Sequence, residues 1–298
     1  MSYERRQSTA AGVAACLVAA VVAAVIVAGS ASAGFVQPEI ACTYDPAAKV
    51  VTVNYGDPTA SDTSNQLPSL SIERHGKQLL FREVTGGEID TRPCTGGTPT
   101  VSNTDRIDLR RIADPLLGTL TFIDLTGGPL GPGATPEKGG SEIEIDADLG
   151  EEPDFDLTGT KKDEYWVFGS KGDRHQVNLN AAEKAPDADL VVHGAPEEFF
   201  MSGSPGDDKW IGSGGKGTGG PLTVHIGAAG GAGDDTLAGG RDDDYFEGDH
   251  GADVIRGGAG DDRIDVYGSE GADHLLCGRG DDHAGVHKND VARDCEHT

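Results

Sequence analysis

The sequence predicts an all-β protein in which short strands stack as the coils of a solenoid. A nine-residue pattern recurs along the last third of the chain, and a fixed short period indicates a repeat architecture. Glycine accounts for 45 of the 298 residues, while only 36% are hydrophobic and 5% aromatic, which is little material for an ordinary layered core. Beyond residue 33, apolar residues alternate in short runs between Gly, Pro and Asp clusters, and no stretch has helical periodicity.

Residues 1–33 have the features of a signal peptide. Arg5 and Arg6 precede an uncharged, Ala- and Val-rich run over residues 9–29, and residues 31–33 read Ala-Ser-Ala. We therefore predict cleavage before Gly34 and a secreted, extracellular protein. The uncharged run is also long enough to span a bilayer, so an N-terminal anchor that is kept is the alternative.

The charge balance excludes two classes of partner. The chain has 50 acidic and 24 basic residues, a formal net charge of −26. Such a chain repels nucleic acid and, once the signal is cleaved, anionic membrane surfaces. Cations are its natural complement, and the sequence does not identify a protein or surface partner. Low hydrophobicity with high net charge is also typical of disorder, so an ordered state needs a further source of stability.

Residues 34–97 are predicted to form a small N-terminal β region. The apolar alternation indicates one strand over residues 49–55 and a second over 70–74. Two of the four cysteines that remain after signal cleavage, Cys42 and Cys94, lie near the two ends of this region.

The even cysteine count in an exported chain predicts two disulfides. Three pairings are possible, and the simplest joins Cys42 to Cys94 and Cys277 to Cys295. The alternative is a zinc site made by the last two cysteines and nearby histidines, although their spacing fits no zinc-binding pattern. Those histidines are His274, His283, His287 and His297.

Residues 98–200 are predicted to be irregular, degenerate coils of the same solenoid. Short alternating runs separated by turn residues indicate strands. In two places an aspartate is followed two residues later by an apolar residue, as in the repeats, but without the glycines: Asp163 with Tyr165 and Asp189 with Val191. The runs lie at residues 120–123, 143–145, 177–179 and 190–192.

Residues 201–285 contain the repeats. From Gly230 the chain reads GGAGDDTLA, GGRDDDYFE, GDHGADVIR and GGAGDDRID, and after two inserted residues it continues GSEGADHLL and CGRGDDHAG. An outlying copy, GSPGDDKWI, begins at Gly203. Each unit has a glycine-rich start, an aspartate at position six and an apolar residue, or once alanine, at position eight.

These motifs resemble the calcium-binding nonapeptide repeats, GGxGxDxUx, of the RTX (hemolysin-type) family. Residues 286–298 resemble the C-terminal cap of its secreted actinobacterial members. The resemblance implies a parallel β-roll in which two repeats form one 18-residue coil, so that alternate repeats stack and several Ca²⁺ ions are bound. It implies that the position-six aspartates are the metal ligands: Asp208, Asp235, Asp244, Asp253, Asp262, Asp273 and Asp282.

By the same resemblance, Asp235, Asp253 and Asp273 line one edge of the roll. Asp244, Asp262 and Asp282 line the other edge, and Asp208 begins an isolated half-site.

The chemistry of the repeats suits calcium, which takes six to eight oxygen ligands from carboxylates and backbone carbonyls. We expect glycine at positions one, two and four because the backbone there adopts conformations closed to residues with a Cβ. Ser204, Asp242, Asp249 and Ser269 replace some of these glycines. Aspartate tolerates left-handed backbone better than most residues, so the turns are expected to survive. Residues 212–220 have glycine where the aspartate should be, and we expect no ion there.

Folding of the repeats is predicted to require the metal. Each unit buries only one apolar side chain, whereas ordering its glycine-rich backbone is costly. Residues 203–298 also carry 20 acids and 8 bases, a net charge of −12. Calcium that binds only the folded form would supply the missing free energy.

The predicted function is that of a calcium-ordered structural or interaction module without catalysis. The alternative is a secreted hydrolase with an unrecognised catalytic region in residues 34–200, although the chain has neither an HExxH nor a GxSxG motif. A third hypothesis is cell adhesion through the Arg-Gly-Asp tripeptide at residues 279–281. Its glycine and aspartate already belong to the turn of the last repeat.

Overall fold

The computed structural model describes residues 40–55, 69–85, 88–111, 119–135, 142–150, 153–182, 187–194, 196–266 and 271–298. All of them belong to one compact unit, residues 37–298. The predicted signal peptide and the substitution at Ser269 lie outside the described residues. Within the described ranges, no helix has the length and apolar character needed to cross a membrane.

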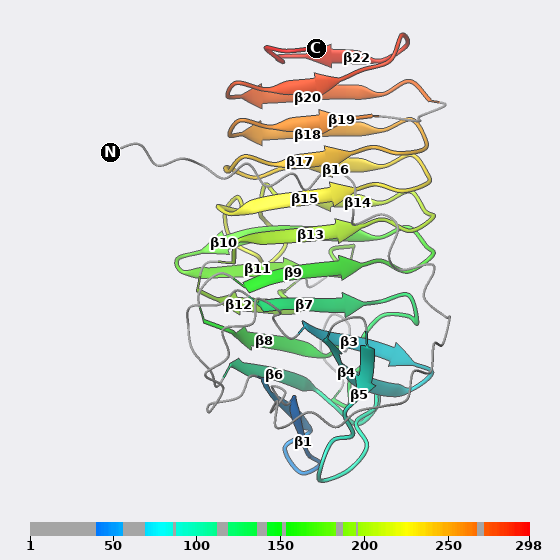
Figure 1. Ribbon diagram of the computed structural model, residues 1–298, viewed down its shortest axis with the longest axis vertical. Helices are drawn as coiled ribbons and strands as arrows, with labels where there is room; N and C mark the ends of the chain where they lie inside the picture. The colour runs from blue at the N-terminus through cyan, green and yellow to red at the C-terminus, as the bar shows by residue number, and fades with distance from the viewer. Residues whose placement is uncertain are drawn as a thin grey trace, which may run out of the picture. The chain divides into compact units, whose positions relative to one another are not determined.

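Every regular element of the described chain is a β-strand, and the strands form two sheets (Figure 1). In spatial order the twelve-stranded sheet contains β1 (Ala41–Asp45), β2 (Val50–Tyr55), β6 (Arg106–Arg111), β8 (Glu144–Asp148), β12 (Leu190–His193), β11 (Arg174–Asn178), β10 (Tyr165–Lys171), β14 (Lys209–Ile211), β16 (Thr236–Ala238), β18 (Val254–Ala259), β20 (His274–Arg279) and β22 (Val291–Arg293). In the opposite sense, starting from its C-terminal end, the ten-stranded sheet contains β21 (His283–Gly285), β19 (Arg263–Asp265), β17 (Tyr245–Glu247), β15 (His225–Ala229), β13 (Glu198–Ser202), β9 (Pro153–Thr158), β7 (Thr119–Asp124), β3 (Ser69–His75), β4 (Gln78–Thr85) and β5 (Glu88–Thr91).

The C-terminal part of both sheets is a regular parallel solenoid. The chain alternates between the sheets, and alternate repeats pair in parallel: Leu237 lies beside Ile255, and Phe246 lies beside Ile264. The all-β fold and the two-repeat coil are therefore as predicted. The position-eight side chains point inward and are all buried: Trp210, Leu237, Phe246, Ile255, Ile264, Leu275 and Ala284.

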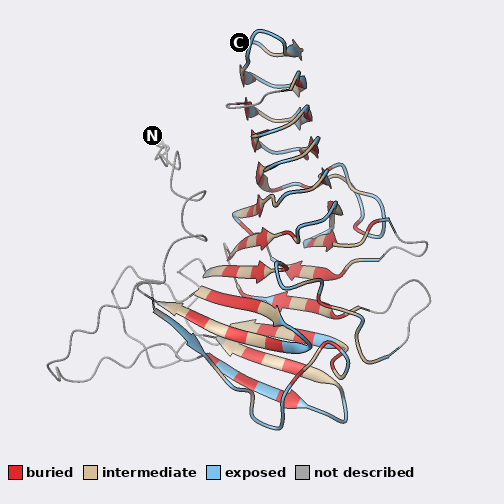
Figure 2. Ribbon diagram, turned by 90° about the vertical axis from the view of Figure 1, so that its right-hand side faces the viewer, coloured by how far each residue is buried: buried red, intermediate tan, exposed pale blue. Residues whose placement is uncertain are grey.

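The parallel pairing continues upstream of the repeats. β2 pairs in parallel with β6, and β6 pairs in parallel with β8 in one sheet. β3, β7, β9 and β13 are likewise parallel neighbours in the other sheet. Strands from residues 34–97 and from residues 98–200 thus share both sheets and one apolar core. Figure 2 shows how the longer N-terminal strands present more buried residues than the short C-terminal ones.

Three antiparallel arrangements in the described chain depart from this regularity, and the first is the pairing of β1 with β2. β10 and β11 form a hairpin, and β11 also pairs antiparallel with β12. β3, β4 and β5 form an antiparallel meander at the end of the other sheet. The predicted degenerate coils between residues 98 and 200 therefore contain one coil with three strands in a single sheet.

Two predicted aspartate–apolar pairs in this upstream region are wrong by one residue. Trp166, not Tyr165, lies beside Trp210, so the residue at position six is Glu164 and not Asp163. In β12 the buried side chains are Leu190 and Val192, whereas Val191 is only partly buried. Neither stretch has the full set of turn glycines that fixes the register of the repeats, and a slip of one residue turns each side chain to the opposite face.

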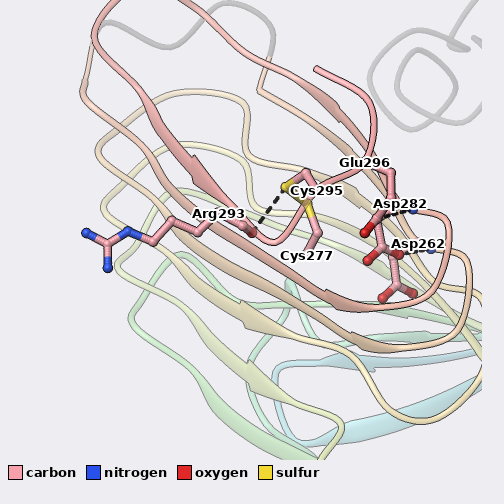
Figure 3. The surroundings of a disulfide bond; sticks show 6 residues. All are labelled: Asp262, Cys277, Asp282, Arg293, Cys295 and Glu296. Carbon is pink, nitrogen blue, oxygen red and sulfur yellow. Dashed lines mark hydrogen bonds between the residues drawn. A yellow bond between two sulfur atoms is a disulfide. The ribbon is translucent and has the colours of Figure 1, made fainter.

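The two nearest-neighbour disulfides are confirmed: Cys42 is bonded to Cys94, and Cys277 to Cys295. The first joins β1 to the segment that follows β5. The second joins β20 to the C-terminal cap (Figure 3). It uses the two thiols that the zinc alternative required, so that alternative is wrong for this structure.

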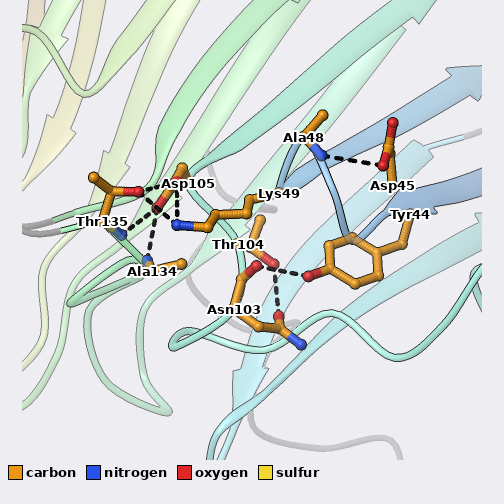
Figure 4. A network of polar contacts seen from close by, with 9 residues as sticks. All are labelled: Tyr44, Asp45, Ala48, Lys49, Asn103, Thr104, Asp105, Ala134 and Thr135. Atoms are coloured by element: carbon orange, nitrogen blue, oxygen red, sulfur yellow. Dashed lines mark hydrogen bonds and ion pairs between the residues drawn. The ribbon is translucent and has the colours of Figure 1, made fainter.

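A polar network closes the N-terminal end of the unit (Figure 4). Asp105 accepts hydrogen bonds from the backbone N–H groups of Ala134 and Thr135 and from the Thr135 hydroxyl, and Lys49 lies 3.6 Å from the carboxylate. Burial acts to raise the pKa of Asp105, but these partners outweigh it, so the pKa lies below its usual range. The network fastens the loop after β7 to the start of β6.

Candidate calcium-binding site

Glycine at positions two and four of the repeats allows a left-handed backbone. Gly231, Gly258 and Gly278 at position two have φ angles of +97°, +120° and +121°. Asp249, which stands at position two in the third copy, has φ of +61°, so this turn is preserved as expected. The second copy differs, because neither Gly240 nor its fourth-position Asp242 has a positive φ.

Glycine at position one is required for a different reason from the one predicted. Among the residues that the structure describes, no position-one glycine of the repeats has a positive φ. Instead, a Cβ on Gly239 would lie 2.0 Å from the Gly257 carbonyl oxygen of the next coil and 2.2 Å from Oδ2 of Asp244. A Cβ on Gly230 would likewise lie 2.5 Å from Oδ2 of Asp235. The missing side chain makes room for the position-six carboxylate and for the neighbouring turn.

The position-six aspartates form a ladder along each edge of the solenoid. On one edge the Asp208 N–H donates to Oδ1 of Asp235 at 2.7 Å, the Asp235 N–H donates to Asp253 at 2.9 Å, and the Asp253 N–H donates to Asp273 at 2.8 Å. Each carboxylate thus links its own turn to the preceding one, 18 or more residues earlier in the chain.

The opposite edge repeats the arrangement. The Asp244 N–H donates to Oδ1 of Asp262 at 2.9 Å, and the Asp262 N–H donates to Asp282 at 2.8 Å. The structure thus places six of these aspartates on the two edges that the resemblance implied, and it adds Asp208 to the first ladder.

The second oxygen of most of these carboxylates has no partner. Oδ2 is buried and accepts no hydrogen bond in five members of the ladders, each at most 1% exposed. An isolated buried carboxylate oxygen is costly unless it is paired or coordinates a metal. These five aspartates are Asp208, Asp235, Asp253, Asp262 and Asp282.

Asp244 is an exception, because its Oδ2 accepts a hydrogen bond from the Gly240 N–H at 2.8 Å. This contact accompanies the altered turn of the second copy, where Asp242 replaces glycine. Asp273 is fully buried, and its Oδ1 accepts the bond from Asp253.

The electrostatics of the ladders favour a cation. Burial raises the pKa of six of the ladder aspartates, namely Asp208, Asp235, Asp244, Asp253, Asp262 and Asp282, and neighbouring carboxylates raise it further. The pKa of Asp253 rises to about 6, of Asp235 and Asp262 to about 7, and of Asp208 and Asp244 to about 8. Neighbouring carboxyl groups in a ladder are difficult to ionise at the same time because the carboxylates repel one another. Ca²⁺ prefers such oxygen ligands, and its positive charge offsets the repulsion between them.

Three residues that sequence reasoning did not assign to the ladders extend them. The Asp273 N–H donates to Oδ1 of Asp290 at 3.1 Å, and the Asp282 N–H donates to Oε2 of Glu296 at 2.9 Å (Figure 3). At the other end the Glu164 N–H donates to Oδ1 of Asp208 at 2.8 Å. The prediction that Asp208 begins an isolated half-site is therefore wrong. Asp208 lies within the ladder, between Glu164 and Asp235.

The stretch of residues 212–220 does not form a turn of the solenoid. Gly215 and Gly219 bond to each other, and Gly220 bonds to Ser170 of β10, so the segment leaves the coil as a loop. The following nine residues supply the turn instead, with Ile226 donating its N–H to Oδ1 of Asp244. An apolar residue thus stands where a ligand would be, and the expectation of no ion at Gly217 remains a prediction.

The C-terminal repeats match a model of a known protein family. A family model for the RTX calcium-binding nonapeptide repeat matches residues 229–264 and 266–284, with four copies. These residues are RTX calcium-binding repeats. No curated protein matches the chain, and no solved structure does either.

The RTX match identifies the protein as a carrier of a calcium-binding structural module. The matched residues include six of the seven predicted ligands, from Asp235 to Asp282. Asp208 and the three additional acids lie outside the matched RTX residues.

Proposed function

We propose that this protein is exported and works outside the cell as a structural or interaction module without catalysis, whose RTX repeats become ordered when several Ca²⁺ ions bind. The supporting observation is the pair of aspartate ladders with their unpartnered, buried Oδ2 atoms. The proposed ligands are the seven position-six aspartates, with further oxygens from the backbone of the turns.

The energetics of the repeats support coupling of folding to metal binding. The strands β14, β16, β17, β19 and β21 have three residues each and bury one large or small apolar side chain apiece. Without an ion, the folded state has to hold rows of carboxylates close together in a segment that is already strongly acidic. Binding of Ca²⁺ to the folded state alone would shift the equilibrium towards it.

Export is supported by two features besides the signal-like N-terminus. Both cysteine pairs are disulfide-bonded, which is typical of proteins in oxidising compartments. Repeats that are ordered by calcium also suit the extracellular space, where free calcium is abundant.

The decisive experiment uses the protein purified after export. Mass spectrometry of its N-terminus tests cleavage before Gly34, and isothermal titration with CaCl₂ measures the number of ions bound. Far-UV circular dichroism with EGTA, and then with excess CaCl₂, should show that β-structure is gained on adding calcium. Titration with MgCl₂ is the matched control. No heat with CaCl₂ and an unchanged spectrum after chelation would overturn the proposal.

A further inference from the structure

The segment 159–164 stacks against the first repeat turn, residues 203–208, in the same way as the repeats stack on one another. The Asp207 N–H donates to Oδ1 of Asp163, just as the Asp234 N–H donates to Oδ1 of Asp207. The Lys209 N–H donates to the Glu164 carbonyl, and the Thr236 N–H donates to the Asp208 carbonyl.

The close approach of the two turns also follows the pattern of the repeats. A Cβ on Gly206 would lie 2.7 Å from the carbonyl carbon of Lys162, the fourth residue of the upstream segment. In the next pair of turns, a Cβ on Gly233 would lie 2.0 Å from the carbonyl oxygen of Gly206. Gly159 at the first position leaves room for its own Glu164, because a Cβ there would lie 2.7 Å from Oε2.

The sequence of this segment explains why a repeat motif does not detect it. It reads GTKKDEYWV, with Thr160 and Lys162 in place of the second and fourth glycines and Glu164 in place of the aspartate. Only the first glycine and the apolar residue at position eight, Trp166, agree with the repeat.

Two carboxylates meet between these turns, and each has one buried oxygen without a hydrogen-bond partner. They are Oδ2 of Asp208, a residue that is 1% exposed, and Oε2 of Glu164. The other Glu164 oxygen accepts bonds from the Thr160 hydroxyl and N–H, and the other Asp208 oxygen accepts the Glu164 N–H.

The surrounding charges do not neutralise this pair. Lys161 and Lys162 are exposed, and among the described residues neither forms an ion pair with Glu164 or Asp208. Lys209 lies over the Tyr165 ring, 4.6 Å from its centroid. Two adjacent carboxylates that each have a buried, unpartnered oxygen are a costly arrangement without a cation, and a divalent ion would relieve it.

We propose that Glu164 and Asp208 hold an additional Ca²⁺ between the segment 159–164 and the first repeat turn. This site lies outside the residues matched by the RTX model and has a glutamate ligand on a turn that lacks two of its three glycines. This inference rests on the proposed calcium-dependent function. The additional ion would extend one ladder by one site. It would make the metal-bound roll continuous with the upstream coils through β10.

The two tryptophans of the chain make this site observable. Trp166 and Trp210 follow Glu164 and Asp208 by two residues, are each 1% exposed, and stack with their ring centroids 5.6 Å apart. Tb³⁺ replaces Ca²⁺ at oxygen-rich sites and emits when a nearby excited tryptophan transfers energy to it. Emission excited where only tryptophan absorbs therefore reports on an ion beside this pair.

The experiment compares the exported protein with its Glu164→Gln, Glu164→Asp and Glu197→Gln variants. Glu197 is an exposed glutamate and serves as the matched control. We expect Glu164→Gln to lower the calcium stoichiometry by one ion and to remove much of the tryptophan-sensitised Tb³⁺ emission. Glu164→Asp, which restores the residue type of the repeats, should retain both, and so should Glu197→Gln.

A further variant separates this inference from the proposed function. Asp262→Asn, on the opposite edge, should lower the stoichiometry without lowering the tryptophan-sensitised emission. If the unmodified protein binds calcium but Glu164→Gln has the same stoichiometry and emission, the additional site is wrong while the proposed function stands. If the unmodified protein binds no calcium, the proposed function fails as well.

Discussion

The first and sixth residues of each repeat act as a pair. The sixth supplies a carboxylate that is tied through Oδ1 to the preceding turn, and the first supplies the space in which the carboxylate and the next coil fit. Substitutions at these two positions should therefore fail in different ways. Loss of the carboxylate affects metal binding, whereas an added methyl group affects stacking.

Asp253→Asn should weaken calcium binding at one site. Loss of the charged oxygen should lower affinity there by about 10- to 100-fold, since a charged partner contributes roughly 1.5–3 kcal/mol. Isothermal titration measures the change in affinity and stoichiometry. Asp294→Asn, which keeps a residue type that tolerates the left-handed backbone at φ of +53°, is the control and should titrate like the unmodified protein.

Gly239→Ala should destabilise the calcium-loaded roll by about 1–3 kcal/mol, because the new methyl group collides with the Gly257 carbonyl and the Asp244 carboxylate. Thermal unfolding in excess calcium measures this. At Gly220 the nearest atom to an added Cβ is 3.8 Å away, so Gly220→Ala should have little effect. Equal unfolding temperatures for the two variants would contradict the packing role of position one.

The pH dependence of the metal-free protein follows from the raised pKa values. Aspartates in the unfolded chain have a pKa near 4, whereas five of the ladder aspartates, namely Asp208, Asp235, Asp244, Asp253 and Asp262, have pKa values of about 6 to 8 in the folded state. Their protons therefore stabilise the folded state below about pH 4, and this contribution is lost as the pH rises to about 8. In EGTA, circular dichroism should show more β-structure at pH 5 than at pH 8.

Protons and calcium should compete for the same carboxylates. The apparent Kd for calcium should thus increase as the pH is lowered from about 8 to about 6, the range over which the ladders titrate. A Kd that is constant across this range would contradict the assignment of these aspartates as ligands.

At the scale of elements, the C-terminal cap completes both ladders. β22 pairs with β20, and the cap contributes Asp290 to one edge and Glu296 to the other. The Cys277–Cys295 disulfide holds this segment in place across a separation of 18 residues. An open last coil would otherwise expose the apolar interior to water.

Replacing both Cys277 and Cys295 by serine should destabilise the calcium-loaded roll by roughly 3 kcal/mol, the value expected for a loop of about this length. Thermal unfolding followed by circular dichroism in excess calcium measures the change. Replacing Cys42 and Cys94 instead removes a bond at the N-terminal end and should leave the calcium titration unchanged.

At the scale of the whole molecule, the described chain has two kinds of coil in one continuous pair of sheets. The upstream coils have longer strands than the RTX coils (Figure 2), and they bury large side chains such as Phe81, Phe155 and Phe168. The RTX coils have short strands and rows of buried carboxylates. Hydrogen bonds such as those that Asp105 accepts hold the upstream end together. The two parts should therefore differ in their dependence on calcium.

Limited proteolysis should reveal this difference. In EGTA, cleavage should remove the RTX repeats and leave a resistant fragment that contains the Cys42–Cys94 disulfide and ends near residue 200. In calcium the chain should resist cleavage as a whole. Mass spectrometry of the fragments identifies the boundary, and rapid degradation of the upstream coils in EGTA would contradict a metal-independent core.

The features that recur at a fixed period can be predicted from the amino-acid sequence. The nine-residue spacing predicted stacked coils with inward side chains such as Leu237 and Ile255. The resemblance to the RTX repeats implied the division of the position-six aspartates between two edges. Glycine and aspartate have strong local preferences, so their period can be recognised without knowing what lies beside them.

Which distant segments complete the ladders is visible only in the folded structure. Glu164 reaches Asp208 across 44 residues that include the β10–β11 hairpin, and Glu296 reaches Asp282 across only 14. Neither separation matches the repeat, because insertions change the length of chain between stacked turns without changing the stacking itself. Contact between turns depends on backbone hydrogen bonds that many sequences can form, and so a residue pattern does not reveal it.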